Sequence, residues 1–131
     1  MHRYLKNLNE IKLFDLNIVG GKNASLGEMM SGLNELDINY PQGYALTTEA
    51  YDDFIKENKI APYLQSMTNK IDLTDTKELH SFGKLIREKI LSLKLSKEIK
   101  EANAIAWNSL NQNSNESFSV AIRSSATAED L

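Results

Sequence analysis

Hydrophobic and polar positions alternate with two different periods along the chain, and each period predicts one kind of secondary structure. Three short stretches have a period near two, which places large apolar side chains on one face of a strand. In the third of them, Phe118, Val120 and Ile122 alternate with small residues. The expected strands are residues 3–8, 44–47 and 118–122.

Longer stretches have apolar residues three or four positions apart, which is the spacing of one helix face. Each begins beside a residue that suits a helix start, either a side chain that accepts from the first backbone amides or a proline. The expected helices begin at or just after Asn23, Thr48, Ala61, Asp75 and Ser96. The first is expected to end near Asp37 and to carry on one face the apolar residues Leu26, Met29, Met30, Leu33 and Leu36.

These elements predict a mixed α/β (α+β) fold with a small sheet and four or five helices. The chain has 131 residues, of which 41% are hydrophobic and 25% are charged. That length and composition are typical of one globular domain with a modest core. Because the pattern contains no internal repeat and no domain-sized linker, we expect residues 1–131 to belong to a single domain.

The charge balance argues against one class of partner. The formal net charge is −3, from 15 basic and 18 acidic residues, and the basic residues form no cluster. Because non-specific nucleic-acid binding needs a concentrated positive face, we expect no nucleic-acid partner. The chain has no cysteine, which excludes disulfides and thiolate metal sites and fits a reducing cytoplasm. No apolar run approaches the roughly 20 residues of a membrane span, so we expect a cytoplasmic protein without a membrane partner.

The first candidate site is Gly20-Gly21-Lys22, directly before the first expected helix. Glycine lets backbone approach a ligand closely, and the amides and dipole at a helix start favour an anion such as phosphate. Lys22 would add a positive charge and Ser25 a hydroxyl. The same tripeptide is also typical of a solvated turn, and its spacing is not that of a Walker P-loop.

The second candidate site follows the last expected strand. Arg123 is one of only three arginines, with Arg3 and Arg87, and it leads into a run of small residues that includes Ser124 and Ser125. A guanidinium beside hydroxyls and backbone amides favours an anion, although a surface ion pair at a strand end explains the same residue. Taken together the two sites point to phosphate, because phosphate transfer needs several converging cations.

Three segments resemble one known family, in order and at matching spacing over essentially the whole chain. They are V-G-G-K-N-A-S-L-G-E-M at 19–29, P-Q-G-Y-A-L-T-T-E-A-Y at 41–51 and V-A-I-R-S-S-A-T-A-E-D-L at 120–131. The first and last are similar to the two opening signatures of the phosphoenolpyruvate synthase (pyruvate, water dikinase) family. The middle segment resembles that family's P-x-G-[FY]-x-x-T-T-x-A pattern.

The resemblance implies the first part of an ATP-grasp nucleotide-binding domain. It implies a magnesium-dependent transfer of phosphate from ATP to a histidine on a separate swivelling domain of the same chain. That domain then carries the phosphate to pyruvate, and the products are AMP, phosphate and phosphoenolpyruvate. By position, Lys22 and Arg123 match the family's lysine and arginine that bind ATP phosphates. Nearby candidates for the same site are Gly20, Gly21, Ser124 and Ser125.

Two related families share the architecture, and the motifs differ from both. Rifamycin phosphotransferases usually carry G-G-K-G-x-N-L-G-E where this chain has G-G-K-N-A-S-L-G-E, and pyruvate, phosphate dikinases usually carry R-S-G-A where it has R-S-S-A. Both departures favour the synthase. The alternative of another class is a stand-alone nucleotide-binding or regulatory module without chemistry.

In the synthase family, a Gly-Gln loop, the adenine pocket and the magnesium carboxylates follow the segment that is matched here. We therefore expect this chain to be part of a longer enzyme, to lack turnover alone, and to have its Mg²⁺ ligands downstream. If residues 118–122 pair with strands that lie downstream, they leave an unprotected edge. Such an edge would fray or associate with a second copy.

Overall fold

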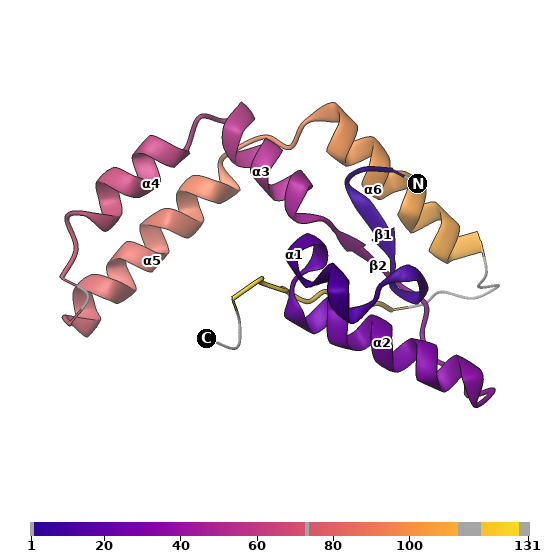
Figure 1. The fold of residues 1–131 in the computed structure, drawn as a ribbon. Coiled ribbons are helices and arrows are strands. Elements are labelled where there is room, and N and C mark those ends of the chain that lie inside the picture. The colour runs from indigo at the N-terminus through magenta and orange to yellow at the C-terminus, as the bar shows by residue number, and fades with distance from the viewer. Residues whose placement is uncertain (1, 73, 113–118, 129–131) are drawn as a thin grey trace. The chain divides into compact units, whose positions relative to one another are not determined.

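The computed structural model describes residues 2–72, 74–112 and 119–128, which contain a two-stranded sheet and six α-helices. The chain divides into two compact units, one formed by residues 1–51 with 97–131 and the other by 52–96. The elements, labelled in Figure 1, are β1 (Leu5–Asn7), α1 (Leu16–Val19), α2 (Gly21–Glu35), β2 (Tyr44–Leu46), α3 (Thr48–Glu57), α4 (Ala61–Thr68), α5 (Thr76–Leu91) and α6 (Lys97–Gln112), with single 3-10 turns at Leu8–Glu10 and Leu13–Asp15.

The sheet of the first unit is short and antiparallel. Strand β1 pairs with β2 so that Leu5 lies opposite Leu46 and Asn7 opposite Tyr44. Thr47 extends the pairing, because its backbone amide donates to Tyr4 O at 3.0 Å. Both strands lie within the stretches expected from the period of two, so these two predictions are confirmed.

Helix α2 packs on the core of this unit through its smallest side chains. Ala24 and Gly27 are buried, and a Cβ placed on Gly27 would lie 2.5 Å from the carbonyl oxygen of Ile11. The helix backbone therefore lies directly on Ile11, which is fully buried. The core cluster consists of Ile11, Val19, Ala24 and Ala45, with Leu8 packed against it.

The apolar face expected for this helix is buried only in part, since Leu26 and Leu33 are half-buried. Met30 is buried, but the side chain of Met29 is 54% exposed and that of Leu36 is 71% exposed. The period of the large apolar residues predicted a helix correctly but did not mark its most buried face, which includes Ala24 and Gly27. The physical reason is that close packing on Ile11 selects small residues, which a hydrophobic pattern does not count as a core face.

A buried ion pair fixes β1 to the segment that precedes α1. Lys6 Nζ lies 2.6 Å from Asp15 Oδ1, and the backbone amide of Lys12 donates to Asp15 Oδ2 at 2.8 Å. Asp15 is 3% exposed. The Lys6 ammonium and then the Lys12 amide lower the pKa of this carboxyl below its ordinary value. The pair therefore holds an ionised carboxylate just before the turn that leads into α2.

Helix α6 completes the first unit. Ile99 and Ala102 are buried on it. At its start, Glu98 forms an ion pair with the Arg3 guanidinium at 3.1 Å. The same guanidinium pairs with Glu49 of α3 at 3.0 Å. These partners are about half exposed, so their pairing supplies orientation more than stability.

The second unit is helical, and its helix starts agree with the sequence. Pro62 lies in the first turn of α4, and Asp75 caps α5 by accepting from the backbone amides of Lys77 and Glu78 at 2.8 and 3.2 Å. Ile60 at the start of α4 is buried. These helix starts are confirmed.

Two expectations about the elements need correction. Four or five helices were expected and six are described, because α1 is a single four-residue turn that is too short to produce a periodic pattern. The third expected strand is absent from residues 119–128, and Phe118 lies outside the described residues. Ile122 is 93% exposed. Alternation predicts an apolar face, but a strand also needs backbone pairing with a neighbouring edge, and residues 119–128 pair with neither β1 nor β2.

Candidate functional site

Gly20 forms a turn between α1 and α2, next to the candidate site. Gly20 has φ +80° and ψ 163°, a region of backbone space that is essentially limited to glycine. A Cβ at this position would lie 2.7 Å from the backbone carbon of Ser125. Glycine is therefore required both by conformation and by the close approach of a distant segment.

The expected cap of α2 is wrong. Asn23 lies inside the first turn and not at the N-cap, which is Gly20, and its side-chain amide donates to Val19 O at 2.9 Å. The N-cap lies three residues earlier than the pattern indicated, because the glycines at the helix start carry no hydrophobic signal.

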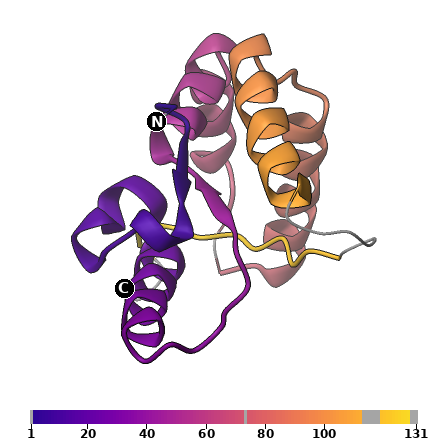
Figure 2. The ribbon, with the colours of Figure 1, turned by 90° about the vertical axis from the view of Figure 1, so that its right-hand side faces the viewer.

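Residues 125 and 126 lie against the start of α2, as the yellow segment of Figure 2 shows. The backbone amide of Gly21 donates to Ala126 O at 2.9 Å. The backbone amide of Asn23 donates to Ser125 Oγ at 3.2 Å, across 102 positions of sequence. Two of the first three amides of α2, which were expected to face an anion, therefore already have acceptors within the protein.

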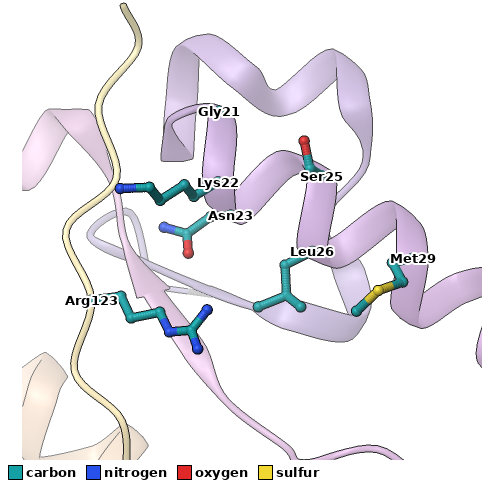
Figure 3. Close-up of a pocket in the computed structure, with 7 residues that line it drawn as sticks. All are labelled: Gly21, Lys22, Asn23, Ser25, Leu26, Met29 and Arg123. Carbon is teal, nitrogen blue, oxygen red and sulfur yellow. The ribbon is translucent and has the colours of Figure 1, made fainter. Parts of the chain in front are cut away.

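A pocket of about 560 Å³ opens beside the joint between residues 125–126 and the start of α2. Residues 119–128 are called the terminal segment. Figure 3 shows the Arg123 side chain extending from it toward α2, where Lys22 lies one turn above Leu26. The lining residues are Gly21, Lys22, Asn23, Ser25, Leu26, Met29 and Arg123. The pocket thus combines two cationic side chains with amide and hydroxyl groups and an apolar wall.

The structure brings together some of the expected site residues and separates others. Gly21, Lys22 and Arg123 line the pocket, whereas Gly20 and Ser125 form the joint behind it. Ser124, also a candidate from the sequence, is exposed and is not among the lining residues that the structure describes.

Sequence reasoning named Lys22 and Ser25 for this site but missed the apolar residues that lie beside them in the pocket wall. Lys22, Ser25, Leu26 and Met29 follow the spacing i, i+3, i+4, i+7 and therefore share one side of α2. The signal was present, because the same spacing marks any helix face. Leu26 and Met29 were considered only as part of an apolar helix face and not as part of a site.

Two further observations limit the chemistry of the described residues. Within 2–72, 74–112 and 119–128, no three histidine, aspartate or glutamate side chains come close enough to hold a metal ion. Among the helices in those same ranges, none has the length and apolar character that crossing a membrane requires.

Comparisons with known proteins agree on one family. Residues 16–131 match the family model described as pyruvate phosphate dikinase, AMP/ATP-binding domain. The chain is 40% identical over 129 residues to a phosphoenolpyruvate synthase of Neisseria meningitidis, covering 98% of this chain and 16% of that protein. It is 35% identical over 123 residues to the Escherichia coli phosphoenolpyruvate synthase, covering 94% and 15%. A probable phosphoenolpyruvate synthase of Methanothermobacter thermautotrophicus is 36% identical over 132 residues, covering 100% and 19%. The chain therefore spans less than a fifth of the length of these curated relatives.

Proposed function

The chain belongs to the pyruvate phosphate dikinase AMP/ATP-binding domain family, and we propose that it forms the phosphate-binding part of the nucleotide site of a phosphoenolpyruvate synthase. The observation that carries this proposal is that Lys22 and Arg123 line one pocket although they are far apart in sequence. The two side chains complement each other, because lysine offers a compact charge and arginine offers a planar fork that suits two phosphate oxygens.

For the whole enzyme we propose the reaction of the synthase family. ATP, pyruvate and water give AMP, phosphoenolpyruvate and phosphate, with a phosphohistidine on a swivelling domain as the intermediate. The fold would be of ATP-grasp type and the role gluconeogenic. The described residues offer no set of Mg²⁺ ligands, so no step through Mg²⁺ is assigned to them. A cytoplasmic location is proposed on the cysteine-free composition.

The proposed task of Lys22 and Arg123 is to hold the triphosphate and offset its negative charge. Both side chains are exposed, so water and salt screen their attraction for a ligand. The pocket has one helix and one extended segment as walls, which leaves most of a nucleotide uncovered. We therefore expect this chain to bind ATP weakly, with Kd on the order of 1 mM at low ionic strength.

Replacing either cation is expected to weaken that binding. Lys22→Ala and Arg123→Ala should each raise the Kd for ATP roughly fivefold to tenfold, because each removes a charged contact to phosphate in a solvated site. Titration of the chain with ATP, followed by backbone amide shifts, measures the effect. Lys100→Ala is the charge-matched control, since Lys100 is exposed on α6 of the same unit and does not line the pocket. Equal weakening in all three variants would indicate general charge attraction and would refute the pocket.

The acceptor can be decided in a full-length protein that carries this segment. We expect AMP to form from ATP in proportion to pyruvate consumed, and no transfer when a rifamycin replaces pyruvate. Transfer to the rifamycin alone would assign the segment to a rifamycin phosphotransferase. Nucleotide binding without transfer to either acceptor would favour a module that keeps the fold without the chemistry.

A further inference from the structure

The start of helix α2 is capped in an unusual way. In most helices the N-cap residue accepts a bond from the second or third backbone amide through a side-chain oxygen. Gly20 occupies that position and has no side chain. We propose that Ser125 serves as the N-cap of α2 in place of Gly20, and that it is a positioning residue and not a phosphate ligand. The positioning role depends on the nucleotide-binding function proposed above, whereas the capping bond does not.

The geometry around the glycine turn supports this assignment. Ser125 Oγ accepts from the amide of Asn23, the third residue of the helix, at 3.2 Å, which is the bond that an N-cap serine normally makes. Ala126 O accepts from the amide of Gly21 at 2.9 Å and satisfies the first helical donor. A Cβ on Gly20 would lie 2.4 Å from Ser125 Oγ, so the space of the missing cap side chain is filled by the serine.

The neighbouring serines are thereby distinguished. Ser125 is half-buried at the helix start, whereas Ser124 is exposed. Sequence reasoning treated them as equal candidates for contact with phosphate. The Ser125 hydroxyl oxygen already accepts a hydrogen bond from the Asn23 amide on the helix side, whereas Ser124 makes no such bond with the described residues.

The cap has a consequence for how the pocket holds an anion. A phosphate could reach the amides of Gly21 and Asn23 only by displacing Ala126 and Ser125. The attraction for an anion therefore comes chiefly from the side chains of Lys22 and Arg123. Arg123 lies two residues before the cap, so the capping bond fixes the backbone that brings its guanidinium to α2.

Amide hydrogen exchange of the 131-residue chain without nucleotide tests the cap directly. Ser125→Ala should accelerate exchange at the Asn23 amide roughly fivefold, the effect typical of losing an N-cap acceptor. The Thr47 amide, which donates to Tyr4 O at 3.0 Å in the same unit, should not change. Ser119→Ala is the matched control, because it removes the same hydroxyl from an exposed residue of the same segment. An ATP titration should then show weaker binding, by roughly threefold, for Ser125→Ala alone.

Each result decides a different point. Unchanged exchange at Asn23 with weaker ATP binding would make Ser125 a phosphate ligand and overturn the proposal. Equal acceleration at Asn23 and Thr47 would mean that Ser125 supports the unit as a whole, which also overturns it. Faster exchange at Asn23 with unaltered ATP affinity keeps the cap and refutes the positioning role. If the unsubstituted chain gives no response to ATP, the nucleotide function and the positioning role both fail, and the Asn23 amide still decides the cap.

Discussion

Asp15→Asn is expected to lower the free energy of unfolding of the first unit by about 2–3 kcal/mol, because removing one partner of a buried ion pair leaves the other uncompensated. Asp15 is 3% exposed, and Lys6 Nζ lies 2.6 Å from its carboxylate. An asparagine oxygen can still accept from the Lys12 amide, but it cannot balance the ammonium. Urea unfolding followed by the fluorescence of Trp107, the single tryptophan and a residue of the same unit, measures the loss.

The same substitution has a definite pH dependence. The pKa of Asp15 is lowered in the folded chain, chiefly by Lys6, so the folded state favours the ionised form. Its stabilising contribution is therefore complete above the unfolded pKa of about 4 and is lost as pH falls through the lower folded value. The difference in stability between the unsubstituted chain and Asp15→Asn should accordingly shrink below about pH 4.

Two variants test the cause of that loss. Asp52→Asn removes an exposed carboxylate in the other unit and should leave the unfolding of the first unit unchanged. Lys6→Met combined with Asp15→Asn should cost less than the sum of the two single changes, because the pair is coupled. Additive losses, or a pH-independent difference, would show that the ion pair does not stabilise the unit.

Gly20→Ala is expected to destabilise the first unit by about 2–4 kcal/mol, from backbone strain and overpacking together. The backbone at Gly20 has φ +80°, which a residue with a Cβ rarely adopts. The new methyl group would also lie 2.7 and 2.8 Å from the backbone carbon and oxygen of Ser125, which cannot rotate away as a side chain could. The terminal segment must therefore move off α2, so the amide of Asn23 should also lose protection from exchange.

Gly32→Ala is the matched control for this prediction. It adds the same methyl group within helix α2, where a Cβ would meet nothing within 4 Å. Because alanine is the better helix former, this variant should gain about 0.5–1 kcal/mol of stability. Urea unfolding of both variants measures the contrast. A Gly20→Ala chain as stable as the unsubstituted one would mean that the terminal segment does not pack on the turn.

The parts of the fold that the sequence predicted are those with a local cause. Strands β1 and β2 follow from alternation, and the start of α5 follows from the capping capacity of Asp75. The orientation of α2 does not follow, because the residues that pack on Ile11 are small and carry no hydrophobic signal. The expected strand at 118–122 fails in its described residues for a related reason, since alternation cannot reveal whether a partner edge exists. Self-association through that strand stays a prediction, and residues 119–122 do not form the strand on which it depends.

The cationic residues of the candidate site could be predicted from the sequence, but the contact of residues 125 and 126 with the start of α2 could not. Two motifs drew attention to Lys22 and Arg123, and the structure places both in one pocket. The family expected from those motifs is confirmed by the match of residues 16–131 to the domain family and by the similarity to proteins named phosphoenolpyruvate synthase. The bond between Ser125 and Asn23 was not predictable, because no local pattern in either segment encodes a contact with the other. The roles of the two cations in nucleotide binding stay predictions.

The distance along the chain between the two halves of that joint also sets an order of events on the ribosome. Asn23 leaves the exit tunnel 102 positions before Ser125. At common rates of synthesis this interval lasts roughly 5–20 s. During it the amides of Gly21 and Asn23 lack their acceptors in residues 125 and 126 and are hydrated instead. Strand β2 and the helical unit are translated within that interval, and β1 precedes it, so the pocket is the last of these features to be completed. A nascent chain shorter than 123 residues contains Lys22 but not Arg123. The pocket is then incomplete, and we expect that a nucleotide cannot stabilise the chain by binding there.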